Sequence, residues 1–89
     1  MSWERRLSQQ AAGNLYDLRK EGGNAAKVNE GIKELAVHEA PSQFAEPVEN
    51  ELLEFPTFKT NIDGCYVEFE LWEKDGRKVI NITLIKQLS

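Results

Sequence analysis

The sequence predicts an α+β domain in which a two-helix hairpin packs on one face of a small antiparallel sheet of three to four strands. Two observations carry this prediction. Residues 64–86 alternate apolar and polar side chains on either side of Asp75-Gly76, a pair typical of two-residue hairpin turns. Residues 8–36 instead carry apolar side chains at helical spacing in two stretches. The expected element order is β-α-α-β-β-β, in a single domain over residues 1–89.

Before the helices, residues 1–7 fit two structures. Trp3 and Leu7 are apolar, and the residues next to them are charged. The segment is therefore either a short edge strand, whose charges would block pairing with another sheet, or the entry to a helix.

Two helices are expected in the first half of the chain. Ser8 is a favoured N-cap, Gly22-Gly23 ends the first helix, and Asn24 caps the second. Gly31 either weakens the second helix by about 1 kcal/mol or lets the two helices approach closely. The apolar stripes are Ala11, Ala12, Leu15, Tyr16 and Leu18 on the first helix and Ala25, Val28, Ile32, Leu35 and Ala36 on the second.

Residues 38–48 are expected to connect the helices to the sheet, because Pro41 and Pro47 cannot continue a helix. A short helical turn fits residues 42–45. Phe44 is expected to cover the edge of the core.

Three strands are expected in the second half of the chain. Residues 50–62 predict a strand that is broken or lies at a sheet edge at Pro56, since proline cannot donate to a ladder. The hairpin that follows places Lys74 opposite Arg77. Its apolar face pairs Leu71 with Ile80, Phe69 with Ile82 and Val67 with Leu84, and its mixed face pairs Tyr66 with Ile85, Glu68 with Thr83, Glu70 with Asn81 and Trp72 with Val79. We expect the helices to cover the apolar face, where Cys65 is also buried.

Composition and charge narrow the function classes. The net charge of −4 argues against general nucleic-acid binding. Residues 39–54 include five glutamates and no Lys or Arg, which fits either a solvated loop or a docking surface for a basic partner. Cys65 is the single cysteine, so neither an internal disulfide nor a Cys-rich metal site is expected. No apolar run reaches the roughly 18 residues of a membrane span, and residues 1–10 lack a secretory signal, so we expect a cytoplasmic protein.

No sequence pattern predicts a cofactor or a metal ion, and phosphate-binding glycine motifs are missing. His38, the single histidine, is interpreted as a helix-end residue rather than a catalyst. Glu68 and Glu70 form either a solvated surface or an acid–base pair, and the solvated surface is favoured. The predicted contact surface for a protein partner or a second copy of the chain consists of Tyr66, Glu68, Glu70, Trp72 and Val79.

Three stretches resemble the RelE/ParE superfamily of bacterial toxin–antitoxin toxins. The family's opening helix resembles residues 7–18 (LSQQAAGNLYDL), its penultimate strand residues 63–71 (DGCYVEFEL), and its closing strand residues 79–88 (VINITLIKQL). The resemblance implies a β-α-α-β-β-β fold, a cognate antitoxin as partner, and ribosome-bound mRNA or a topoisomerase as target. If the protein is an enzyme, the resemblance implies a ribosome-dependent endoribonuclease, with Lys59, Tyr66 and Lys86 as candidate catalytic residues.

The predicted mixed face argues against RNA cleavage. The family's pattern has arginine where this chain has Val67, and its RNases carry Lys and Arg on the face where this chain has Glu68 and Glu70. Carboxylates repel a phosphate placed beside them. We therefore expect a toxin-type protein that acts through macromolecular contacts. The alternative is a non-catalytic domain that binds a protein partner or a second copy of itself.

Overall fold

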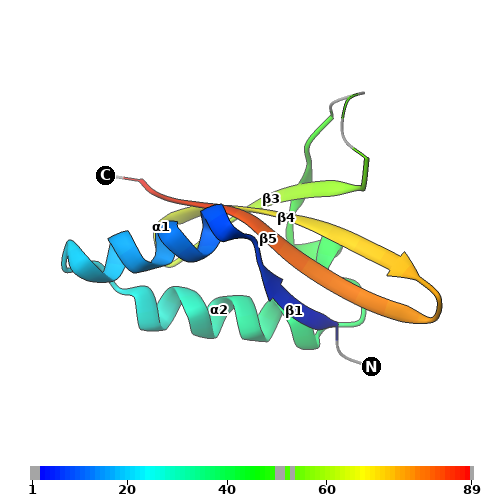
Figure 1. Ribbon diagram of the computed structural model, residues 1–89, viewed down its shortest axis with the longest axis horizontal. Coiled ribbons are helices and arrows are strands. Elements are labelled where there is room, and N and C mark those ends of the chain that lie inside the picture. Colours follow the sequence, from blue (N-terminus) through cyan, green and yellow to red (C-terminus); the bar gives the residue numbers. More distant parts are fainter. Residues whose placement is uncertain (1–2, 50–51, 53, 89) are drawn as a thin grey trace.

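Two α-helices lie on one face of a five-stranded sheet (Figure 1). The computed structural model describes residues 3–49, 52 and 54–88. In chain order the elements are β1 (Glu4–Leu7), α1 (Gln9–Lys20), α2 (Ala25–Val37), the 3₁₀ helix η1 (Pro41–Phe44), β2 (Glu46–Pro47), β3 (Thr57–Ile62), β4 (Cys65–Lys74) and β5 (Arg77–Gln87). The predicted α+β class is confirmed, whereas the prediction of three to four strands is wrong.

The sheet is mixed, with the strand order β1-β5-β4-β3-β2. β1 runs parallel to β5, and the other neighbours are antiparallel, so the prediction of a purely antiparallel sheet is also wrong. A parallel pair needs a long connection between its strands, and here the chain passes through both helices and three further strands before β5 returns beside β1. For residues 4–7, the edge strand is therefore the correct one of the two alternatives.

The β4–β5 hairpin turns at Asp75 and Gly76, which have positive φ values of 55° and 76° as a type I′ turn requires. The predicted register holds from the Lys74–Arg77 pair to the Phe69–Ile82 pair. Beyond that point β5 contains an extra residue, which is a β-bulge. The observed pairs are Glu68–Leu84, Val67–Ile85 and Tyr66–Lys86, so the predicted pairs Glu68–Thr83, Val67–Leu84 and Tyr66–Ile85 are wrong.

The bulge coincides with the start of α1. β1 ends opposite Ile82, and from there the N-terminal half of α1 takes over the hydrogen bonding of β5. The Ser8 N–H donates to the Ile82 carbonyl at 2.9 Å, and the Ser8 hydroxyl donates to the Thr83 carbonyl at 3.3 Å. Six residues further along, Asn14 Oδ1 accepts the Ile85 N–H at 3.2 Å. As a result Ile85, with 4% of its surface exposed, faces the core in place of Leu84.

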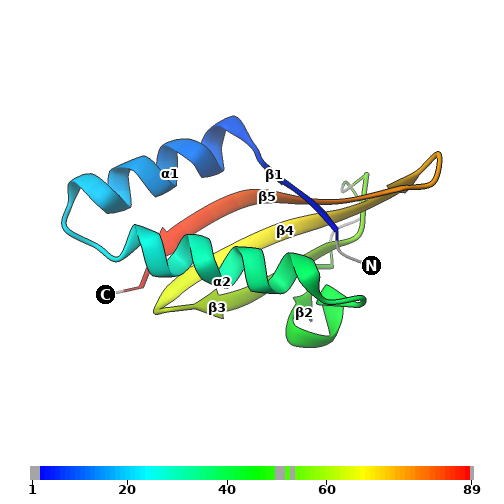
Figure 2. The same cartoon turned by 90° about the horizontal axis from the view of Figure 1, so that it is seen from below.

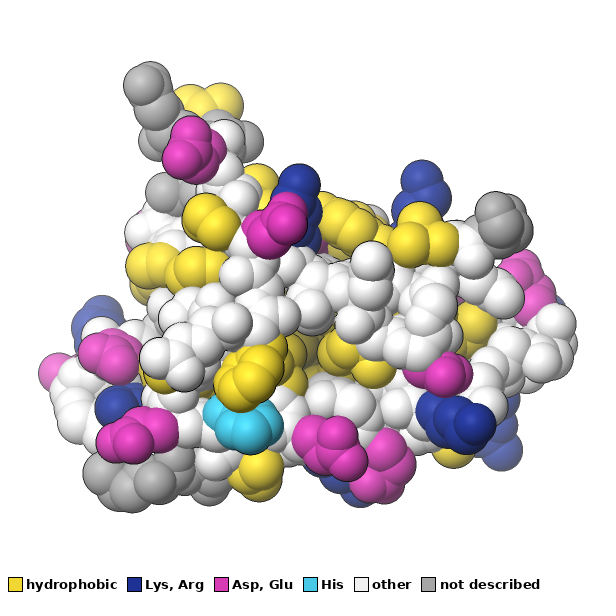
Figure 3. Space-filling model, turned by 180° about the vertical axis from the view of Figure 1, so that it is seen from behind, with side chains coloured by type: hydrophobic (Ala, Val, Ile, Leu, Met, Phe, Trp, Pro, Cys, Tyr) yellow, Lys and Arg dark blue, Asp and Glu magenta, His cyan; other side chains and the backbone are white. Residues whose placement is uncertain are grey.

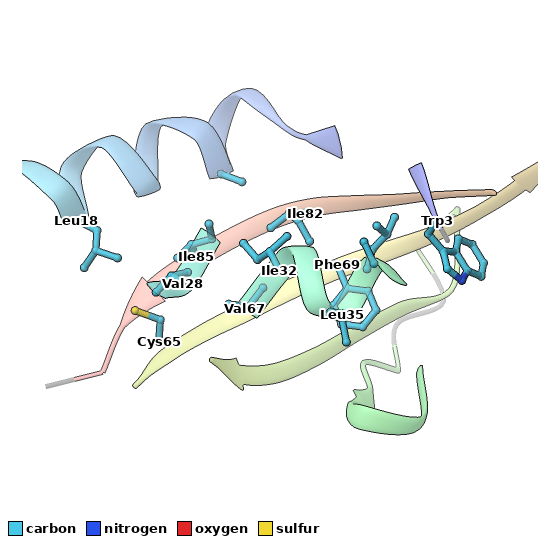
Figure 4. Close-up of a cluster of buried hydrophobic side chains, with 13 residues drawn as sticks. Trp3, Leu18, Val28, Ile32, Leu35, Cys65, Val67, Phe69, Ile82 and Ile85 are labelled. Carbon is cyan, nitrogen blue, oxygen red and sulfur yellow. The ribbon is translucent and has the colours of Figure 1, made fainter. Parts of the chain in front are cut away.

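The core lies between α2 and the helix-facing side of β4 and β5 (Figure 4). Val67, Phe69, Ile80 and Ile82 from the hairpin and Ile32 from α2 are all 0% exposed. The predicted burial of Cys65 on the same face is confirmed. The helices therefore cover the apolar face of the hairpin, as the sequence predicts.

The two helices make unequal use of their predicted stripes. Asn24 caps α2 and Ser8 caps α1, as predicted. α2 crosses the sheet and buries four residues of its stripe, Val28, Ile32, Leu35 and Ala36. α1 lies beside β5 at the margin of the sheet and buries only Ala11 and Leu18 (Figure 2). Tyr16, which the stripe places in the core, is 66% exposed.

Two further expectations are corrected. A Cβ atom on Gly31 would lie 2.3 Å from Ile62 Cγ2, so the close approach at this glycine is between α2 and β3 rather than between the helices. Phe44 does not cover the core: it is 53% exposed, and its ring centroid lies 4.4 Å from that of His38. The predicted break at Pro56 is confirmed, since β3 begins at the next residue, and residues 50, 51 and 53 of the predicted strand lie outside the described residues.

Candidate functional site

The sheet surface that faces away from the helices is the candidate site, and we call it the open face. Neither α-helix covers it (Figure 1). Cross-strand partners share a face, so the register defines its members. They are Glu4 and Arg6 on β1, Glu46 on β2, Thr57, Lys59 and Asn61 on β3, Tyr66, Glu68, Glu70 and Trp72 on β4, and Val79, Asn81, Leu84 and Lys86 on β5. All five residues of the predicted contact surface lie here.

Trp72 is held on three sides at one end of the open face. Its ring centroid lies 5.0 Å from the Arg6 guanidinium carbon and 5.1 Å from the Phe55 ring centroid. Its indole N–H donates to Glu70 Oε1 at 3.3 Å. A cation, an aromatic ring and a carboxylate thus fix an aromatic side chain that is still partly exposed, which is the arrangement of a preformed contact residue.

Asn81 lies next to this cluster and is only 5% exposed. Its Nδ2 donates to Glu70 Oε1 at 2.9 Å, and because an ionised carboxylate only accepts, this bond fixes the orientation of the amide. Asn81 Oδ1 is then a buried acceptor without a hydrogen-bond partner among the described residues. Sequence reasoning placed Asn81 opposite Glu70 but did not predict Arg6 here, because the pairing of β1 with β5 has no local signal.

The three candidate catalytic residues come together at the other end of the open face, around Glu68. Tyr66 donates its hydroxyl proton to Glu68 Oε2 at 2.9 Å. Lys86 lies opposite Tyr66, and Lys59 lies opposite Glu68. The bulge produces the first of these neighbours, because the uninterrupted register would have put Ile85 there.

At this end of the open face, the Tyr66 side chain is a protonated, hydrogen-bonded phenol and not a base. Burial raises the pKa of the Tyr66 phenol, and the hydrogen bond to Glu68 and the charge of Glu68 raise it further. At neutral pH the phenol is therefore protonated, and its proton is already engaged by Glu68. An open groove of about 680 Å³ adjoins Tyr66 and Lys59 and continues along η1 and β2.

Other potentially reactive groups lie outside the open face. His38 is exposed at the C-cap of α2. Cys65 is buried on the helix side, where burial and, to a smaller extent, the charge of Asp63 raise the pKa of its thiol. Within the described ranges, no three His, Cys, Asp or Glu side chains are grouped closely enough to hold a metal ion.

Neither α1 nor α2 is long and apolar enough to span a membrane, and no other described segment is a helix that could. The sequence matches no model of a known protein family, and a search of curated proteins finds no match either.

Proposed function

We propose that this chain is a RelE/ParE-like toxin-type protein of a bacterial toxin–antitoxin pair, acting through contacts that its open face makes with a macromolecule. The order of the elements carries the proposal. A first strand, a helical hairpin and three consecutive antiparallel strands follow one another, apart from the short η1–β2 segment. This is the order that the resemblance implies, and it leaves one sheet face without helices for the target.

The side chains of the open face support binding rather than RNA cleavage. Glu68 and Glu70 stand at its centre, between the Trp72 cluster and the two lysines. Tyr66 keeps its proton at neutral pH, so it cannot take one from an attacking hydroxyl, and it donates that proton in a hydrogen bond to Glu68 rather than to a leaving group. Partly buried aromatic residues with fixed neighbours are the usual anchors of protein interfaces.

A non-catalytic binding domain without toxicity is the second candidate. Leu84 favours it, because this partly exposed apolar side chain lies on the same face as Trp72 and suits contact with a protein or a second copy of the chain, whereas Val79 on that face is only 9% exposed. Both candidates use the same surface. They differ in whether the contact stops growth.

The test is controlled expression of the chain in a bacterium from a tightly repressed promoter, with growth followed after induction. We expect arrest, and we expect a product of an adjoining short reading frame to relieve it. Trp72→Ala and Glu68→Lys should restore growth by at least tenfold in colony count. Tyr16→Ala, which removes an exposed aromatic ring on α1, is the matched control and should arrest growth like the wild type.

Tyr66→Phe separates contact from catalysis, since it removes the hydroxyl and keeps the ring. We expect it to arrest growth, and loss of arrest with an unchanged circular dichroism spectrum would contradict a non-catalytic mechanism. Normal growth while the soluble wild-type protein accumulates would overturn the toxin-type role and leave the binding domain.

A further inference from the structure

The β4–β5 hairpin is longer than the helices that cover it. Its strands run to Lys74 and Arg77, whereas α2 ends at Val37 (Figures 1 and 2). Past the end of α2, the helix-facing side of the hairpin is bordered by the N-terminal segment, η1 and the start of β3. These elements enclose a groove of about 500 Å³, which we call the hairpin groove.

Apolar side chains line most of the hairpin groove. Leu71 and Phe58 contribute from the sheet, and both are partly exposed although they belong to the face that α2 covers elsewhere. Trp3, 7% exposed, and the buried Pro41 contribute from the neighbouring segments. The walls come from four separate parts of the chain, and Trp3 is fixed by the hydrogen bond from its indole N–H to the Glu39 carbonyl at 3.1 Å. The groove is therefore preformed.

Acidic side chains flank the groove. Glu39 and Glu73 line it and are exposed, and the described residues that line it include no Lys or Arg. Figure 3, which shows the molecule from behind the view of Figure 1, shows acidic (magenta), basic (dark blue) and hydrophobic (yellow) side chains interspersed on this side of the molecule. An apolar floor with carboxylates beside it favours a ligand that is apolar and positively charged.

The ammonium group of Lys78 lies beside two residues of the groove, Trp3 and Glu73. Its ammonium nitrogen lies 5.4 Å from the Trp3 ring centroid and 3.8 Å from Glu73 Oε1. The aromatic face and the carboxylate thus act together on one positive charge. Glu39, on the other side of Trp3, has no such partner among the ion pairs of the described residues.

We propose that the hairpin groove binds a partner protein segment that carries an apolar side chain flanked by Lys or Arg. The apolar side chain packs on Leu71 and Phe58. One flanking cation pairs with Glu39, and another pairs with Glu73 in place of Lys78. The net charge of −4 acts in the same direction by attracting basic segments. Phe58, Leu71 and Glu73 lie on the side of the sheet opposite the open face, so this inference does not rest on the proposed function.

The probe is a synthetic peptide of eight residues, Lys-Leu-Leu-Lys-Lys-Leu-Leu-Lys with blocked ends, and the control peptide has Glu in place of every Lys. Binding is followed through the ¹H–¹⁵N signal of the Trp3 indole. The backbone amide signals of Tyr66 and Lys86, at the far end of the open face, are the internal references, since Phe55 both lines the groove and packs against Trp72. We expect the basic peptide to shift the Trp3 signal and to bind at least tenfold more tightly than the acidic one. Raising the salt concentration from 0.05 M to 1 M should weaken binding severalfold, because salt screens the attraction between the peptide lysines and the glutamates.

Two pairs of charge-neutralising changes test the location. The double change Glu39→Gln with Glu73→Gln should weaken the binding of the basic peptide at least fivefold. Glu21→Gln with Glu34→Gln removes the same charge from the C-cap of α1 and an exposed position of α2, and it should change the affinity less than twofold. All four residues are exposed, so these variants keep the core intact.

Three results would overturn the proposal. They are equal binding of the two peptides, an unshifted Trp3 signal, and equal weakening by both pairs of changes. A Trp3 signal that moves with protein concentration, together with a dimer in sedimentation, would show that a second copy fills the groove instead of a basic partner.

Discussion

Gly13 and Gly31 both lie inside helices, but their surroundings differ. Nothing lies within 4 Å of a Cβ atom built on Gly13, whereas one built on Gly31 meets Ile62 Cγ2 at 2.3 Å. Isoleucine is β-branched and stiff at χ1, so this methyl group cannot swing away cheaply. The glycine in α2 is thus required by the packing on β3, and the glycine in α1 is not.

Alanine at these two positions should therefore have opposite effects. Gly31→Ala is expected to lower the free energy of unfolding by about 1–3 kcal/mol, because overpacking outweighs the gain in helix propensity. Gly13→Ala should raise it by about 1 kcal/mol, since only the propensity changes. Urea denaturation measures both, and stabilisation by both substitutions would show that α2 does not lie this close to Ile62.

Tyr66 gives the fold an alkaline pH dependence. The pKa of its phenol is raised by burial, by the hydrogen bond to Glu68 and by the Glu68 charge. The folded state therefore holds this proton more tightly than the unfolded state. The stabilisation is complete below about pH 10 and is lost as the pH rises through the raised pKa.

Tyr66→Phe removes this titration, so its melting temperature should fall less steeply than that of the wild type between about pH 9 and pH 11. The exposed Tyr16 offers the matched control, and Tyr16→Phe should follow the wild-type curve. Cys65, whose pKa is also raised, is common to all three proteins and does not affect the comparison. Parallel curves for Tyr66→Phe and the wild type would mean that the bond to Glu68 does not form in solution.

At the scale of elements, the hydrogen bonds between the N-terminal part of α1 and β5 lie where the side chains of β5 change the face that they present to the core. β5 has β1 as a neighbour only up to Ile82. Beyond it, Asn14 supplies the acceptor for the Ile85 N–H. A helix side chain thus replaces a strand at the point where the bulge changes the register.

Asn14→Ala should leave the Ile85 N–H without its acceptor. We expect the free energy of unfolding to fall by about 1 kcal/mol, although alanine is the better helix former. The Ile85 amide should also exchange its hydrogen at least tenfold faster. Gln10→Ala, at an exposed position of the same helix, should leave this exchange rate unchanged, and equal rates in all three proteins would contradict the assigned bond.

The turns illustrate what local sequence predicts at this scale. The residue types of Asp75-Gly76 alone predict a turn, and the φ values of the two residues agree. Asp63-Gly64, between β3 and β4, adopts the same positive φ values of 49° and 78°. The same dipeptide signal was present there, so the register of β3 could also have been predicted. The bulge could not have been predicted, because it lies where Ser8 and Asn14 of the first helix bond to β5.

At the scale of the whole molecule, the sheet presents two different surfaces to partners. The open face has aromatic side chains around a carboxylate centre, and the hairpin groove on the opposite side has an apolar floor with acidic flanks. The first carries the proposed function, and the second carries an independent proposal about a basic partner. The two can be tested separately because Trp3 lines the groove, whereas Tyr66 and Lys86 lie at the far end of the open face.

The sequence by itself determined the α+β class, both helices with their caps, the hairpin turn and its buried face, because these depend on residues that are close along the chain. Only the tertiary structure decided the parallel pairing of β1 with β5, the bulge, the exposure of Tyr16 and Phe44, and the meeting of Lys59, Tyr66 and Lys86 around Glu68. The physical reason is sequence separation. Arg6 and Asn81 meet because the whole domain has closed around its core, and no local spacing or turn chemistry encodes such a contact.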